Sequence, residues 1–264
     1  MRSLRWIATW VIAATLLTGC WDNDEPPPVT PSASPGSQDS SLDSSPRQLT
    51  VQEARDALLT AENLGEGYED APDEDGTGES PPLGCLEAIS DFDKDVQGVD
   101  AKAQFAFMPQ TTAGVPDVIN GVLSFGTLEQ ATSFMRRFAS TFASCQKVDK
   151  RAENGIAVDL SVNLDERVAD GNVDEQANLY AEGSFRFRDQ GLQFSIAMSV
   201  ARVKNSIIAV LTTDLDSLAA VAPLTKEYLR LGVDRLRAVM AGEDPPNDTS
   251  SVSPEPHTAP PADV

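Results

Sequence analysis

Residues 179–213 read LYAEGSFRFRDQGLQFSIAMSVARVKNSIIAVLTT, and this stretch decides the fold class. Its apolar runs predict three consecutive strands, over Leu179–Arg188, Leu192–Val203 and Ser206–Thr213. The strands are separated by turn sequences typical of hairpins, Asp189-Gln190-Gly191 and Lys204-Asn205. Strands joined by such short turns pair antiparallel, because a parallel pair needs a long crossover connection. The stretch therefore predicts an antiparallel sheet.

Further strands are expected upstream. Residues 156–164, IAVDLSVNL, alternate strictly between apolar and polar side chains. This alternation is typical of an antiparallel strand with one face in the core and the other open to water. Two earlier strands are predicted, one beginning near Ala101 and one over Asp117–Phe125. The segment that begins NVDEQAN at residue 172 is expected to interrupt the strands.

Two capping boxes mark helix starts. Thr50-Val51-Gln52-Glu53 and Thr127-Leu128-Glu129-Gln130 each place a threonine three residues before a glutamate or glutamine. In the second helix, apolar residues recur at helical spacing and predict the buried face: Leu128, Ala131, Met135, Phe138, Phe142 and Cys145. A short helix is expected over Pro81–Ile89. A last helix is expected over Pro223–Ala241, because proline suits the first turn.

The predicted order is helix, strands, helix, strands, helix. The late strands join without crossover helices, which indicates the α+β class. We expect a single domain with a mainly antiparallel sheet and helices packed on one face.

The N-terminus resembles an export signal. Arg2 and Arg5 precede an apolar run, Trp6–Leu17, that is shorter than the roughly 20 residues a membrane-spanning helix needs. The following Leu17-Thr18-Gly19-Cys20 resembles the lipobox of bacterial lipoproteins. The resemblance implies that Cys20 is acylated and becomes the new N-terminus, with the acyl chains holding the protein on the membrane. The alternative is an ordinary signal peptide with a coincidental cysteine.

The composition divides the chain into four parts. Residues 1–19 are the expected signal peptide, and residues 20–47 form a tether rich in Pro, Ser and Asp. Residues 48–241 form the expected domain, and residues 242–264 an acidic, proline-rich tail expected to be disordered. Removing the signal deletes two arginines and no acid, so the net charge changes from -21 to -23. Such a charge argues against nucleic acid and anionic lipid head groups as partners.

With Cys20 assigned to the anchor, Cys85 and Cys145 remain. An even number of cysteines in an exported protein predicts a disulfide, and two free thiols are the alternative. Closing a loop of that size stabilises a fold by about 4 kcal/mol in the chain-entropy description.

Little in the domain indicates catalysis. The one histidine, His257, lies in the tail, so histidine-based catalysis and histidine-bearing metal sites are not expected in the domain. No nucleotide-binding glycine motif is present, and we expect no cofactor and no metal site. Arg186 and Arg188 share one face of a predicted strand. They are candidate contacts for an anionic ligand if that face lines a cleft, and the alternative is an ordinary solvated strand face.

One stretch near the start of the domain resembles a known family. LLTAENLGEGYE, residues 58–69, together with Cys85 after a proline and Cys145 at the end of a long helix, is similar to the extracellular sensor domain of actinobacterial PknH-type receptor kinases and related lipoproteins. The resemblance implies an α+β domain with a cleft that binds an unidentified ligand outside the cell. This chain departs from the family in having cysteines for one disulfide rather than two, and no kinase domain. Any sensing would therefore act through a partner.

The sequence thus predicts a non-enzymatic lipoprotein on the outer face of the cytoplasmic membrane whose domain binds a ligand or partner. An envelope-structural or protein-interaction lipoprotein without a small ligand is the alternative. A hydrolase that uses carboxylates alone is the least favoured interpretation.

Overall fold

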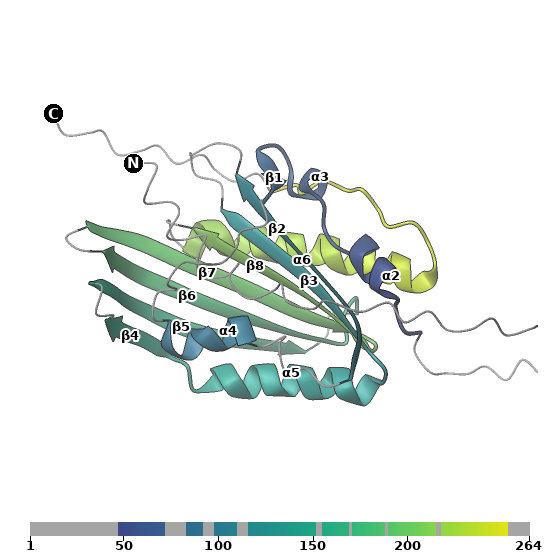
Figure 1. The fold of residues 1–264 in the computed structure, drawn as a ribbon, viewed down its shortest axis with the longest axis horizontal. Coiled ribbons are helices and arrows are strands. Elements are labelled where there is room, and N and C mark those ends of the chain that lie inside the picture. Colours follow the sequence, from purple (N-terminus) through teal and green to yellow (C-terminus); the bar gives the residue numbers. More distant parts are fainter. Residues whose placement is uncertain are drawn as a thin grey trace, which may run out of the picture.

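The computed structural model describes residues 47–71, 83–91, 98–109, 116–151, 155–168, 171–187, 190–214 and 218–252. Within these residues, eight strands form one antiparallel sheet, and the helices lie against it (Figure 1). The expected α+β class and antiparallel sheet are confirmed.

The strands are listed in chain order: β1 Tyr68–Asp70, β2 Val99–Pro109, β3 Asp117–Phe125, β4 Lys147–Arg151, β5 Ile156–Val168, β6 Glu175–Phe187, β7 Gln190–Val203 and β8 Ser206–Asp214. Their order across the sheet is β1-β2-β3-β8-β7-β6-β5-β4. The two edges are therefore β1 and β4. The β7–β8 hairpin turns at the predicted Lys204-Asn205 pair.

The helical segments are α2 Val51–Asp56, α3 Ala61–Leu64, the 3₁₀-helix η1 Gly84–Glu87, α4 Ala88–Asp91, α5 Leu128–Ala143 and α6 Leu218–Ala241. Both predicted capping boxes are present. The Thr50 side chain accepts from the Glu53 backbone N–H, and the Thr127 side chain accepts from that of Gln130. These bonds satisfy backbone donors that a helix start otherwise leaves without partners.

The expected interruption at residues 172–178 is wrong over most of its length. Strand β6 begins at Glu175, and its first residues pair with both β5 and β7. Asn178 is fully buried although its neighbour Leu179 faces the opposite side of the sheet. Because the buried positions here include an amide, the usual contrast between apolar and polar positions is lost.

The expectation that the helices lie on one face of the sheet is also wrong. Along β8, Ile207 and Leu211 belong to the core beneath α5, whereas Ile208 and Val210 belong to the core beneath α6. Successive strand residues point to opposite faces, so α5 and α6 cover opposite sides of the sheet (Figure 1). The run of apolar residues in β8 follows from burial on both faces.

The face beneath α5 is rich in aromatic side chains. Phe138 and Phe142 are fully buried, with ring centroids 5.0 Å apart. Phe134, which the predicted stripe omitted, is buried too, whereas Leu128 in the first turn is exposed. Cys145 is buried as expected but lies just beyond the helix end.

The face beneath α6 has the other large core. Gly232 lies so close to the sheet that an added Cβ would stand 2.5 Å from Cδ1 of Ile208. Helix α6 begins at Leu218, so the predicted start at Pro223 is wrong and the proline lies inside the helix. The helix extends upstream because Leu218, Val221 and Ala222 find apolar neighbours on β6 and β7.

The chain after α6 folds back onto the domain. Asn63 donates through Nδ2 to the Asp248 carbonyl at 2.9 Å, and its own carbonyl accepts from the Ser250 N–H at 2.9 Å. Arg235 donates through Nη1 to the Pro246 carbonyl at 2.8 Å and through Nε to the Leu58 carbonyl at 2.7 Å. The packed chain therefore continues past residue 241, and this strap ties α3 and the end of α2 to α6.

Candidate binding face

The structure describes some of the site residues that the sequence predicts and leaves others outside the described ranges. Cys20 and Arg188 lie outside the described residues. Arg186 is exposed on β6, where it pairs across the sheet with Ala157 of β5 and Gly191 of β7. The structure therefore gives one of the two candidate arginines a position.

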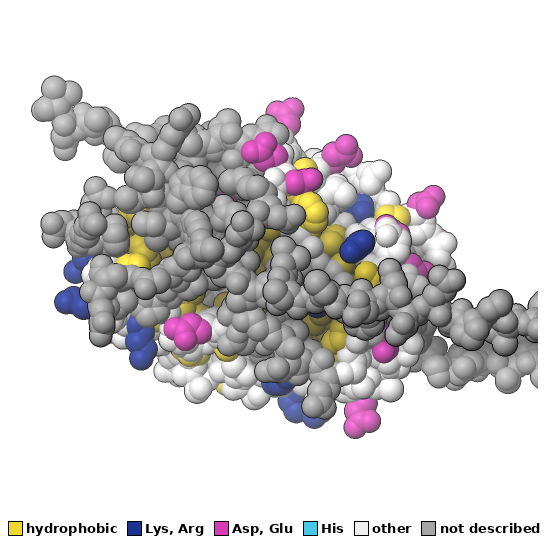
Figure 2. Space-filling model, in the orientation of Figure 1, with side chains coloured by type: hydrophobic (Ala, Val, Ile, Leu, Met, Phe, Trp, Pro, Cys, Tyr) yellow, Lys and Arg dark blue, Asp and Glu magenta, His cyan; other side chains and the backbone are white. Residues whose placement is uncertain are grey.

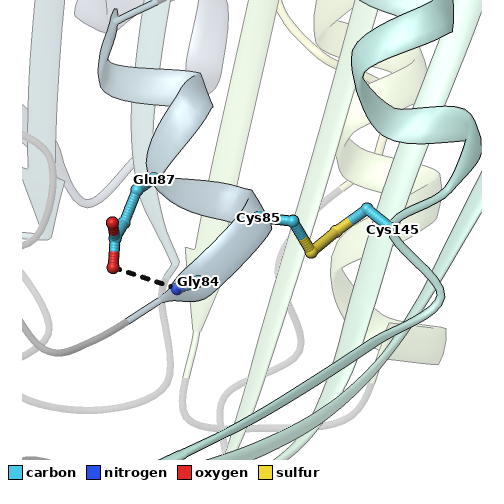
Figure 3. The surroundings of a disulfide bond; sticks show 4 residues. All are labelled: Gly84, Cys85, Glu87 and Cys145. Carbon is cyan, nitrogen blue, oxygen red and sulfur yellow. Dashed lines mark hydrogen bonds between the residues drawn. A yellow bond between two sulfur atoms is a disulfide. The ribbon is translucent and has the colours of Figure 1, made fainter.

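The predicted disulfide is confirmed. Cys85 in η1 and Cys145 after α5 are bonded, with their Cα atoms 5.8 Å apart (Figure 3). Glu87 accepts through Oε1 from the Gly84 N–H at 3.0 Å, which caps the short η1 helix that presents Cys85. The bond ties η1 to the end of α5, and its role is structural.

The α6 side of the sheet is only partly covered by helices. Helix α6 packs on β7 and β8 and reaches β6. On β4 and β5, among the described residues, the same side carries polar side chains that are mostly exposed: Lys147, Asp149, Arg151, Asp159, Ser161 and Asn163. We call these residues, with Glu182, Ser184 and Arg186 of β6, the polar face. It corresponds to the water-facing side that the IAVDLSVNL alternation predicts.

Charges on the polar face interact across the β4–β5 pair. Lys147 Nζ lies 3.2 Å from Asp159 Oδ1 and 3.6 Å from Asp149 Oδ2. The hydrogen bond with Asp159, followed by the charges of the two carboxylates, raises the pKa of Lys147. Because all three side chains are exposed, these ion pairs add little to the stability of the fold. Their effect is on the distribution of charge over the polar face.

Basic side chains are concentrated at this end of the molecule. Figure 2 shows lysines and arginines along the side where Figure 1 places β4 and β5, while acidic side chains gather near β1 and α3. Lys147, Lys150 and Arg151 of β4 and Arg186 of β6 are the described basic residues of this region. In a chain of net charge -21, this end is distinctive.

The polar face continues beneath α6 as a group of buried polar side chains on neighbouring strands. We call Asn178, Tyr180, Ser199 and Thr212 the buried polar cluster. Asn178 Oδ1 accepts from Ser199 Oγ at 2.8 Å and from Gln176 Nε2 at 2.9 Å. The Tyr180 ring lies at the margin, with Lys226 Nζ of α6 5.8 Å from its centroid.

Two atoms of the buried polar cluster have no hydrogen-bond partner within the described part of the chain. These are Asn178 Nδ2 and Thr212 Oγ1. Sequence reasoning missed both, because the segment that begins NVDEQAN predicts an interruption of the strands and Thr212 lies near the end of a predicted apolar strand. One signal could have identified them. Both are polar residues at strand positions that pair with buried residues of the neighbouring strands.

The ranges that the structure describes bear on two further kinds of site, a metal site and a membrane span. In the described residues, no three histidine, cysteine, aspartate or glutamate side chains gather as a metal site would require. None of the helices in these same ranges is both long and apolar enough to cross a membrane.

The comparisons with known proteins give a likeness in fold. No protein-family model matches the sequence. No curated protein matches it either. Among solved structures, the extracellular domain of PknH from Mycobacterium tuberculosis is similar, with a TM-score of 0.51 and 10% sequence identity. The match covers 73% of this chain and 98% of that domain. The described fold is therefore PknH-like, in agreement with the resemblance in sequence.

Proposed function

We propose that this chain is an exported lipoprotein whose domain recognises a ligand or partner outside the cytoplasm. Acylated Cys20 would hold the protein on the outer face of the cytoplasmic membrane, with residues 20–47 as a tether. The short apolar run and the lipobox-like LTGC support the anchor. The likeness to a domain described as extracellular supports the location.

The observation that carries the binding role is the polar face beside α6. A side open to water is common in antiparallel sheets, so the exposure of this face is not by itself the signal. Here exposed charged and hydroxyl groups on β4, β5 and β6 stand beside buried polar groups beneath α6, which is an arrangement suited to hydrogen-bonded recognition. We infer that Arg186 contacts the ligand; the second candidate, Arg188, lies outside the described residues.

The proposed role is recognition without catalysis. In this proposal the recognition event is passed to a separate membrane or envelope protein.

The anchor is tested by cell fractionation of a Cys20→Ala variant. We expect the variant to leave the membrane fraction and the wild-type protein to remain in it, because two acyl chains are needed for stable attachment. Ser34→Ala in the tether is the matched control and should fractionate as wild type. Equal membrane retention of the Cys20→Ala protein would contradict acylation at this residue.

The binding role is tested by thermal-shift screening against peptidoglycan fragments and phosphorylated sugars. A ligand that binds the folded state raises the melting temperature by mass action. We expect Arg186→Ala to lose about tenfold in affinity for the binding fragment, which is typical of one lost charged hydrogen bond. Arg55→Ala, an exposed arginine of α2, is the control and should bind as wild type. Equal binding by both variants would remove Arg186 from the site.

A further inference from the structure

The two ends of α6 rest on different parts of the sheet. From Leu224 onward, the buried residues of α6 belong to the large core shared with α2, β2, β3 and β8. Leu218, Val221 and Ala222 instead form a small separate cluster with Tyr180 and Ala197. The first turns of α6 are therefore held by far less apolar contact than the rest of the helix.

A break in the helical hydrogen bonding separates these two parts. Pro223 has no N–H, so the Ala219 carbonyl lacks its usual helix partner. Thr225 donates through Oγ1 to the Val221 carbonyl at 2.8 Å, a side-chain bond that often bends helices. The joint between residues 218–222 and the rest of α6 is the mechanically weak point of the helix.

The two polar atoms without partners lie beneath this region. Thr212 pairs with Ala197, which pairs with Tyr180, so these residues form one row across β8, β7 and β6. Asn178 is in the next row on the same face of the sheet. A buried polar group without a partner costs about 1 to 3 kcal/mol. Asn178 lies on β6 and Thr212 on β8, with β7 between them, and two such groups on the same covered face call for partners that enter from outside the fold.

We propose that residues 218–222 form a lid hinged at Pro223, and that its opening admits a neutral, acceptor-bearing group of the ligand into the buried polar cluster. Separate oxygens of the ligand accept hydrogen bonds from Asn178 Nδ2 on β6 and from Thr212 Oγ1 on β8. This assignment rests on the proposed binding function and specifies where part of the ligand is held.

The chemistry of the site selects the ligand class. Asn178 Oδ1 is occupied by Ser199 and Gln176, so the free donors require an acceptor from the ligand. The charged residues next to these donors on the same face are mostly acidic: Asp165 pairs with Asn178 across β5 and β6, Asp214 lies two residues after Thr212 on β8, and Glu182 lies on β6, with Lys226 of α6 as the nearby cation. An anionic acceptor such as a carboxylate or a phosphate would therefore be repelled. Carbonyl and hydroxyl oxygens on a partly apolar body, as in N-acetylated sugars, meet both conditions.

Opening of the lid is tested by thiol labelling of two single-cysteine additions on β8. Thr212→Cys places a thiol beneath residues 218–222, and Ile208→Cys places one beneath Gly232. Labelling of each site in the full-length protein is followed by peptide mass spectrometry, which separates it from Cys20 and from the disulfide. We expect the Thr212→Cys site to react about 100-fold faster, because local opening needs less free energy than global unfolding.

The control variant makes the test harder for the proposal to pass. Ile208→Cys removes core volume and destabilises the fold, which speeds labelling at position 208. Equal rates at the two positions would overturn the lid.

The ligand class is tested with N,N′-diacetylchitobiose, a neutral N-acetylated disaccharide, by isothermal titration. Its cationic de-N-acetylated form is the comparison. We expect the neutral sugar to bind the wild-type protein, and Thr212→Val to bind it at least about tenfold more weakly while folding with equal or greater stability, since the variant removes a buried hydroxyl without a partner. No binding of the neutral sugar, or tighter binding of the cationic one, would overturn the ligand class. If an envelope fragment binds wild type and Thr212→Val equally, the proposed function survives and this site is wrong.

Discussion

The two faces of the sheet are stabilised in different ways. Beneath α5 the contacts are almost entirely apolar, with Phe138 and Phe142 at their centre, and a disulfide fixes the end of the helix. Beneath α6 a second apolar core is combined with buried polar anchors, including Arg235 and the pair Tyr68–Tyr228. The Tyr68 and Tyr228 rings meet edge to face, with centroids 6.3 Å apart.

The difference shows which face is suited to change. Apolar contacts are non-directional, so they keep their stabilising energy as long as the surfaces stay in contact. Hydrogen-bonded anchors need a particular distance and angle, so they lose most of their stabilising energy when the partners shift. The α5 side therefore behaves as a permanent support. The α6 side, with its polar anchors and its buried polar cluster, is the one on which binding and conformational change are expected.

The largest effect is expected from breaking the disulfide on the α5 side. The double variant Cys85→Ser and Cys145→Ser should lose about 4 kcal/mol in the free energy of unfolding, because its unfolded chain regains the entropy of an open loop. Urea denaturation with and without a reducing agent measures this loss.

The location of the loss distinguishes the two faces. Hydrogen exchange that proceeds by local opening should speed up most in η1 and at the end of α5, whereas amides of α6 that exchange only by global unfolding should speed up by no more than the global loss allows. Equal acceleration on both sides would show that the faces are not independently supported.

The next effect concerns the buried guanidinium of Arg235. It donates to the carbonyls of Asp56 at 2.8 Å, Leu58 at 2.7 Å and Pro246 at 2.8 Å. Burial lowers its pKa, yet its donors satisfy three carbonyls from two segments, the end of α2 and the chain after α6. Arg235→Met should cost about 3 kcal/mol, since these acceptors lose a charged donor.

Thermal or urea unfolding of Arg235→Met provides the measurement. Arg237→Met is the matched control, because Arg237 is exposed and donates to the Asn172 carbonyl and side chain at the surface. It should change stability by no more than about 0.5 kcal/mol. An equal loss of unfolding free energy in both variants would contradict the anchoring role of Arg235.

The smallest effect comes from the tyrosine pair. The Tyr228 hydroxyl donates to the Leu64 carbonyl at 3.3 Å and lies 3.2 Å from the Tyr68 hydroxyl. Tyr228→Phe should cost about 1 kcal/mol at neutral pH, the usual value of one such bond. Urea unfolding at pH 8 measures it.

The same pair predicts a dependence on alkaline pH. Burial raises the pKa of Tyr228 to about 12 and raises that of Tyr68 as well. A raised pKa means that the fold favours the neutral phenol, so this stability is complete below the ordinary pKa of about 10 and is lost as the pH rises toward 12. Tyr228→Phe should flatten the fall in urea midpoint between pH 10 and 11. An unchanged slope would contradict the burial of the hydroxyl.

Much of the fold could be predicted from local sequence patterns. Strand β3 has the predicted bounds, and both capping boxes form, because each depends on a few neighbouring residues. Strand β4, KVDKR, was not predicted since it has one apolar residue and exists through its pairing with β5. The position of α5 and α6 on opposite faces was equally inaccessible, because it depends on which strands flank β8.

Less of the candidate site could be predicted from the sequence. The alternation in β5 predicted a water-facing side, and the structure places Arg186 on the side facing away from the α5 core. Asn178 and Thr212 gave no local signal, because a buried polar residue looks the same in a sequence as an exposed one. Their importance comes from what α6 covers, which is a property of tertiary structure.

The two sheet edges have a practical consequence for the behaviour of the protein at high concentration. Strand β1 has three residues, whereas β4 offers a longer free edge and bears Lys147, Lys150 and Arg151. Charged side chains on an edge strand repel a second copy and prevent open-ended strand pairing between molecules. We expect that replacing these three residues with valine or threonine would favour strand pairing between molecules at this edge.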